Sequence, residues 1–146
     1  MSQTSLGYCP DSASVTLTNA QVLTLRATPV TIVAAPLASK AIVFIGAAIT
    51  VDGTAGAFTE STANLGFKMV DGSGVQVATT VESTGFMDQA GIMHTRATPK
   101  LDPIMTAAQV AGKALVLHNL GGGEFGGGNA ANSMKVTVYY DLVDIV

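Results

Sequence analysis

Apolar and polar residues alternate over several short stretches of this chain, which is the period of half-buried β-strands. The clearest alternation lies near the C-terminus, where one face would carry Met134, Val136, Val138, Tyr140 and Leu142 and the other Lys135, Thr137, Tyr139 and Asp141. Further strands are predicted at residues 15–17, 30–34, 41–51, 65–69, 75–77 and 114–119. Strands therefore dominate the predicted secondary structure.

Two of these stretches carry further detail. Up to Ile45, apolar residues of the strand at residues 41–51 occupy both alternation phases, which favours burial on both faces. Asp71-Gly72-Ser73-Gly74 separates two strands and offers residues suited to the positive φ angles of a tight turn, so it predicts a β-hairpin. Residues 82–103 give a weaker signal and are expected to form a long connection with one strand.

Two short helical turns interrupt the strands. Thr18 and Gln21 have the spacing of a capping box, and Pro29 ends any helix that precedes it, so we predict a short helix over about residues 19–25. Thr106 and Gln109 repeat the spacing, and Gly112 suits a left-handed helix end.

These elements add up to about eight strands and one or two short helical turns, which predicts an all-β fold, a jelly-roll-like β-sandwich. A length of 146 residues fits one domain. We expect that domain at residues 13–146, after an extended N-terminal arm at residues 1–12. Such an arm is either a frayed end or a contact segment whose apolar anchors are Leu6, Tyr8 and Pro10.

Charged residues make up only 12% of the chain, about half the usual share, so much of the surface is neutral or covered by another molecule. The formal net charge is −3 with no basic stripe, which argues against nucleic-acid binding. The apolar run Ala41–Ile49 is about half the length that a membrane-spanning helix needs. Residues 1–10 lack the pattern of a signal peptide, and we expect a protein that acts without export or membrane insertion.

The candidate chemistry is sparse. Gly121, Gly123 and Gly126 formally match a dinucleotide-binding glycine motif, but a strand and not a helix is predicted after them, which favours a mobile or tightly bent loop. His94 and His118 are far apart in the sequence, and neither lies in a cluster with the spacing of metal ligands. We therefore predict no catalytic residue, no metal, no cofactor and no small-molecule substrate.

Cys9 and the acidic residues give no stronger signal. Cys9 is the single cysteine, so no intrachain disulfide can form, and no base accompanies it as a nucleophile would need. Asp141 and Asp144 are three residues apart in a predicted strand and would point to opposite faces. They are expected to be solvated or to lie at an interface.

Two stretches resemble structural proteins of tailed bacteriophages. Residues 18–36 (TNAQVLTLRATPVTIVAAP), followed by Lys40–Val43, resemble the start of such proteins, and residues 113–143 (KALVLHNLGGGEFGGGNAANSMKVTVYYDLV) resemble their end. The family is that of capsid decoration, or cement, proteins. The resemblance implies a compact β-sandwich, often trimeric, that sits on the outside of an icosahedral head and clamps neighbouring major capsid subunits. It implies no active-site residues.

The working hypothesis is a non-enzymatic cement protein, made in the host cytoplasm and located on the capsid exterior of the virion. Its partners would be the major capsid protein and further copies of itself in a homotrimer. The expected interface residues lie in the arm and the glycine-rich loop: Leu6, Tyr8, Pro10, Gly122, Glu124 and Phe125. The alternatives are a small enzyme and a host-attachment or glycan-binding β-sandwich on the phage head or tail. The absence of Trp and a 5% aromatic content count against glycan binding.

Overall fold

The computed structural model describes residues 7–60, 62–101 and 104–145, and these ranges contain nine strands and two short helices. Their order is β1 (Asp11–Thr18), α1 (Asn19–Leu23), β2 (Val30–Val33), β3 (Lys40–Asp52), β4 (Phe58–Thr59), β5 (Leu65–Met69), β6 (Ile92–Ala97), α2 (Ala107–Val110), β7 (Leu115–Asn119), β8 (Gly126–Gly127) and β9 (Ser133–Asp144). The predicted all-β class is confirmed.

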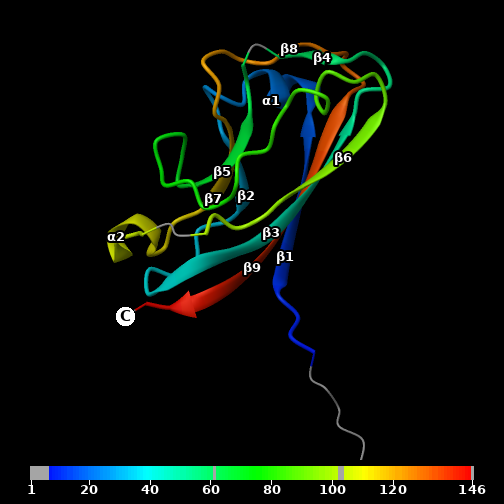
Figure 1. Cartoon of the computed structure of the whole chain (residues 1–146). Helices are drawn as coiled ribbons and strands as arrows, with labels where there is room; N and C mark the ends of the chain where they lie inside the picture. The colour runs from blue at the N-terminus through cyan, green and yellow to red at the C-terminus, as the bar shows by residue number, and fades with distance from the viewer. Residues whose placement is uncertain (1–6, 61, 102–103, 146) are drawn as a thin grey trace, which may run out of the picture.

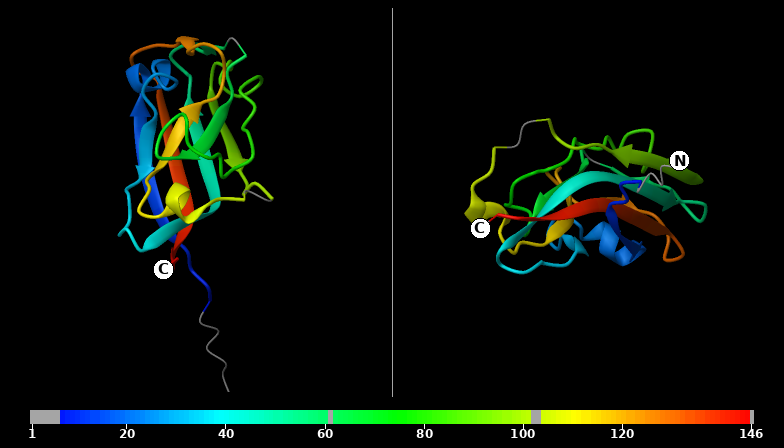
Figure 2. Two further views of the ribbon diagram at one scale, coloured as in Figure 1. Left: turned by 90° about the vertical axis from the view of Figure 1, so that its left-hand side faces the viewer. Right: turned by 90° about the horizontal axis from the view of Figure 1, so that it is seen from below.

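Two antiparallel sheets form the layers of a sandwich (Figure 2). The larger sheet has the strand order β1-β9-β3-β6 and the smaller has the order β2-β7-β5, while β4 and β8 form a separate pair. The sheets meet in one core, where the rings of Phe44 on β3 and Phe67 on β5 lie 5.3 Å apart between centroids. Burial of the apolar face of each sheet against the other is the main stabilising contribution of such a core.

The strand β9 follows its predicted alternation over most of its length. Met134, Val136 and Val138 are completely buried, and Lys135 and Tyr139 point outward. Leu142, expected on the buried face, is 41% exposed. The covering strands of the smaller sheet have only four or five residues, so the end of this 12-residue strand runs past them.

The strand β3 differs from its prediction on one face. Ala41, Ile42 and Phe44 are buried, but Val43 is 43% exposed, because its side chain lies on the outer face of the larger sheet, where no further layer covers it. A register shift between Phe44 and Gly46 then changes the alternation, and Ala47, Ile49 and Val51 continue the buried face.

Both predicted helical turns form, and each is capped by its threonine and glutamine. At α1 the Gln21 backbone N–H donates to Thr18 Oγ1 (3.3 Å), and Gln21 Oε1 accepts from the Thr18 backbone N–H (2.9 Å). At α2 the backbone N–H of Thr106 donates to Gln109 Oε1 (2.8 Å), and Gly112 follows with a φ of 62°. Within the described ranges no helix is long and apolar enough to span a membrane.

The predicted hairpin after β5 also forms, with a different turn geometry. The backbone N–H of Met69 donates to the Val75 carbonyl (3.0 Å), and that of Val77 donates to the Phe67 carbonyl (3.0 Å). The left-handed residue is Val70 (φ 72°) and not a glycine of the turn. Gly74 is needed for another reason, because a Cβ there would overlap the carbonyl oxygen of Met69.

The first strand begins at Asp11, inside the segment predicted as an arm. Asp11 and Ser12 pair with Tyr140 and Tyr139 of β9, which is long enough to extend the ladder by these two pairs. Residues 7–10 precede the strand without regular structure and run away from the sandwich along the line of β1 (Figure 1). β6 supplies the single strand expected in residues 82–103.

Candidate functional site

The titratable groups considered for catalysis lie apart from one another. His94 is on the outer face of the larger sheet, where its Nδ1 lies 2.9 Å from Thr50 Oγ1. His118 is on β7, and its buried Nδ1 has no hydrogen-bond partner. Across the described ranges, no three His, Cys, Asp or Glu side chains lie close enough to hold a metal ion together. These groups therefore supply hydrogen bonds and charge at separate places in the fold and do not converge on one site.

A side-chain hydrogen bond joins the described part of the arm, residues 7–10, to β9. The Tyr8 hydroxyl donates a hydrogen bond to the Asp141 carboxylate. This bond, a partial loss of hydration and the negative charge of Asp141 raise the pKa of Tyr8 to about 12. The Tyr8 side chain is nonetheless 69% exposed and Pro10 is partly exposed, so both offer apolar surface outside the sandwich. Leu6 lies outside the described residues.

The glycine-rich loop is tightly bent, one of the two forms expected for it. Asn119 holds it from inside: its Nδ2 donates to the Gly123 carbonyl (3.0 Å) and its Oδ1 accepts from the Gly121 backbone N–H (2.8 Å). Gly122 is exposed, and a Cβ built on it meets no other atom within 4 Å. This residue therefore presents bare backbone to solvent.

Glu124 and Phe125, two of the residues expected at an interface, face their own chain. The Glu124 carboxylate accepts from the backbone N–H groups of Arg26 (2.9 Å) and Ala27 (2.7 Å). Phe125 is 3% exposed and belongs to the core. Burial of an aromatic ring stabilises the sandwich. Because the ring is buried, Phe125 offers no surface to a partner and is no longer a candidate contact.

The remaining candidate contacts lie at opposite ends of the sandwich. Residues 7–10 of the arm leave the end where Asp11 pairs with Tyr140, and the glycine-rich loop lies at the other end, near the β4–β8 pair (Figure 1). The eight-residue strand β1 runs between the two ends and spans about 26 Å at 3.3 Å per residue.

The outer face of the larger sheet connects these ends and is nearly neutral in net charge, because Lys135 and Arg96 on it are balanced by Asp52 and Asp141. Hydroxyl side chains dominate it, and one cross-strand pair is Ser14 with Thr137, whose oxygens are 2.6 Å apart. A shallow hollow of about 760 Å3 lies on this face over Gly46 and Ala48, with Arg96 and Tyr139 at its sides. The small residues make the hollow because they leave the backbone of β3 uncovered.

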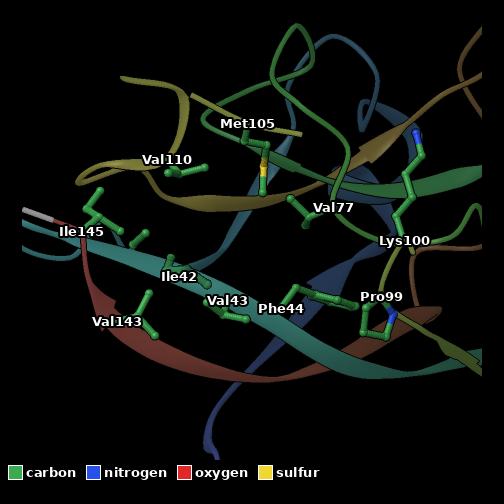
Figure 3. Close-up of a pocket in the computed structure, with 11 residues that line it drawn as sticks. Ile42, Val43, Phe44, Val77, Pro99, Lys100, Met105, Val110, Val143 and Ile145 are labelled. Carbon is green, nitrogen blue, oxygen red and sulfur yellow. The ribbon is translucent and has the colours of Figure 1, made fainter. Parts of the chain in front are cut away.

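A second, apolar depression, which we name the edge pocket, opens at the side of the sandwich between β3 and α2 (Figure 3). Its volume is about 350 Å3, and its lining includes Ile42, Phe44, Val77, Met105, Val110 and Val143. Lys100 is the one charged residue in that lining. Leu101 and Ile104, each 97% exposed, are on the same connection between β6 and α2.

Sequence analysis missed the edge pocket. The available signal was the pair Leu101 and Ile104, two large apolar residues in a segment with no strand or helix pattern. The pocket itself depends on where β6 stops pairing with β3, and that pairing joins residues about 45 positions apart and leaves no local pattern.

Comparisons with known proteins give no family for this chain. No family model matches its sequence, and no curated protein is significantly similar to it. Among solved structures, the chain is similar to one described as the cyanophage Pam1 capsid asymmetric unit, with a TM-score of 0.47 and 14% sequence identity. The match covers 96% of this chain and 91% of that one.

Proposed function

We propose that this chain is a structural virion protein, a decoration or cement protein that binds the outer surface of a phage head and clamps neighbouring major capsid subunits. The sequence resemblance of residues 18–36, 40–43 and 113–143 to tailed-phage decoration proteins supports this role. So does a composition with few charges, which suits a surface made to be covered by other protein.

The observation that carries the proposal is the placement of the two exposed contact segments at opposite ends of the sandwich (Figure 1). A clamp must touch two neighbouring subunits at once. Tyr8 and Pro10 at one end and Gly122 at the other end offer two such contacts about one strand length apart. Leu6 is proposed as part of the first contact from its place in the sequence alone. Two weak contacts held on one rigid body bind much more tightly together than either alone.

The nearly neutral face between these ends serves the same role. Its two basic and two acidic residues balance one another, so a surface of low net charge can cover it, with these four side chains paired or still hydrated at the contact. Its Ser and Thr hydroxyls both donate and accept hydrogen bonds and can pair with many backbone groups. The protein acts through bound surface, without catalysis and without a cofactor, and is proposed to work as a homotrimer on the capsid exterior.

Purified phage heads that lack the protein give the direct test. Added protein is expected to bind expanded heads at saturable sites and to raise the temperature at which they release DNA, and to increase their resistance to chelators. Failure to bind, or binding without any gain in head stability, would contradict the proposal. A hit on a glycan array together with no head binding would favour the glycan-binding alternative.

Variants at each end test the clamp itself. Removal of residues 1–10 takes away one contact, and Gly122→Glu places a charged side chain into open space at the other without disturbing the fold. Each variant is expected to bind heads more weakly and to lose the stabilising effect, because one end alone cannot bridge two subunits. Thr31→Glu, on the exposed side of β2 in the smaller sheet, is the matched control and should behave as the unmodified protein.

A further inference from the structure

Half of one edge of β3 has no neighbouring strand in the part of the chain that the structure describes. β6 pairs with β3 from Ala47 to Asp52, and residues 40–46 continue that edge without it. The backbone N–H of Gly112 donates to the Lys40 carbonyl (2.9 Å), which shows that this carbonyl points away from β9. Backbone groups of alternate residues in a strand point to the same side, so Ile42 and Phe44 present theirs to the open edge.

The open edge borders the edge pocket. Ile42 and Phe44 supply both the backbone of the edge and apolar side chains of the pocket lining (Figure 3). An unpaired edge beside an apolar depression is a site where an extended segment can add as a further strand, with main-chain hydrogen bonds and side chains in the pocket. A suitable segment is apolar or neutral, because Lys100 is the one charged residue of the lining.

The N-terminal arm has this chemistry. Residues 1–10 contain no charged side chain, and Leu6, Tyr8 and Pro10 share one face when the segment is extended. Ten extended residues reach about 33 Å. Residues 7–10 of the arm leave the sandwich at the end where β3 begins and run away from their own edge pocket (Figure 1). A pocket and a matching segment that point apart on one chain suit exchange between copies.

We propose that residues 1–10 of a second copy of this chain add as a strand to the edge of β3 at Ile42–Phe44 and fill the edge pocket. The inference rests on the proposed role of the arm as a contact segment and replaces its direct partner: the arm would hold a second copy seated on the neighbouring capsid subunit, so that the two subunits are bridged through linked copies. Arm exchange is a heterologous contact, and a ring of copies can close it without leaving an arm or pocket free. The exposed hydrogen bond from Tyr8 to Asp141 would be given up on exchange.

Cys9 makes the proposal directly testable, because it is the single cysteine and lies in the arm. In an added strand its side chain lies on the opposite face from Tyr8, the face shared by Ile45 of β3 and by Val43, which also borders the edge pocket (Figure 3). Cross-strand neighbours have Cβ atoms about 5 Å apart, within reach of a disulfide. Val43→Cys and Ile45→Cys, made separately in the full chain, cover neighbouring registers. Mild oxidation with diamide is expected to give covalently linked oligomers in at least one.

Two control variants test whether a cross-link is specific to Cys9 and to the open edge of β3. Ile92→Cys places an exposed thiol at the far end of the same sheet, where Ile92 pairs with Asp52, and should give no such product. Val43→Cys combined with Cys9→Ser should also give none. Val43 is half exposed, and circular dichroism will verify that each variant folds.

Two results would overturn the inference: a disulfide from Cys9 to position 43 or 45 within one chain, or no cross-link at either position in the folded protein. Head binding separates this outcome from the proposed function. If unmodified protein stabilises heads and no cross-link forms, arm exchange fails and the clamp stands. If cross-links form and heads are not bound, the clamp fails alone.

Discussion

The carboxylate of Glu124 accepts a hydrogen bond from the backbone N–H of Ala27 at 2.7 Å, and so connects the glycine-rich loop to the segment that follows α1. It also accepts from the backbone N–H of Arg26, whose Nε in turn donates to the Gly121 carbonyl (2.6 Å). Three hydrogen bonds therefore hold the loop against residues 26–27. The donors and acceptors of these hydrogen bonds lie near solvent, so each bond contributes less to stability than a buried one would.

Replacement of this carboxylate is expected to loosen the loop. Glu124→Ala should lower the free energy of unfolding by about 1–2 kcal/mol, because two backbone N–H groups lose an ionised acceptor. Urea denaturation measures the change. Glu82→Ala is the control, since Glu82 is exposed and accepts one long hydrogen bond from Asn64 Nδ2 (3.4 Å). An equal loss in both variants would mean that the Glu124 contacts add nothing specific.

The link between Tyr8 and Asp141 predicts a pH dependence of the arm. The pKa of Tyr8 is raised to about 12 from its usual 10.0, so the neutral phenol is favoured in the attached arm. The contribution of this bond is complete below pH 10 and is lost as the pH rises through 12. In the dilute, monomeric chain, where the arm contacts its own β9, the difference in tyrosinate absorbance between the unmodified chain and Tyr8→Phe should titrate near pH 12. Asp141→Asn should move that titration back toward pH 10. No change with Asp141→Asn would contradict the contact.

His118 predicts a weakening of the fold in mild acid. Partial burial lowers its pKa, and the positive charges of Lys68 and Arg26 act in the same direction. The unfolded chain takes up a proton near pH 6.5, while the folded chain still holds the neutral ring. The contribution of the neutral His118 ring to stability is therefore complete above pH 6.5 and is lost as the pH drops through the folded-state pKa of His118. In His118→Asn the thermal midpoint should fall less between pH 7 and about pH 5 than in the unmodified chain. If the thermal midpoint falls equally in His118→Asn and in the unmodified chain, another group causes the acid sensitivity.

Local patterns explain what could be predicted from the sequence. The caps at Thr18 and Thr106 depend on side chains three residues away, and the alternation of Met134 to Val138 depends on the strand itself. Each is complete within a few neighbouring residues, so each is visible without the fold. The all-β sandwich follows from the sum of such local signals.

Contacts between distant segments explain what could not be predicted. Phe125 looks like an exposed anchor in a run of glycines, but the loop folds back and buries it. In the sequence Glu124 resembles a surface carboxylate without a partner, but its oxygens accept hydrogen bonds from backbone N–H groups about 97 positions away. Val43 sits in a continuous apolar run and is exposed because no layer covers the outer face of the larger sheet. In each case the deciding neighbour comes from another part of the chain.

Val70 holds a backbone conformation that its side chain opposes. Its φ of 72° lies in the left-handed region, where a β-branched residue is rare and strained, and its side chain is half exposed. Asn accepts this conformation more readily, so Val70→Asn should raise the free energy of unfolding by about 1 kcal/mol. Val75→Asn, across the same turn, should not stabilise the chain and controls for a general effect of the polar amide. Urea denaturation of both variants checks the prediction, and a loss of stability in Val70→Asn would mean that packing of the valine outweighs the strain.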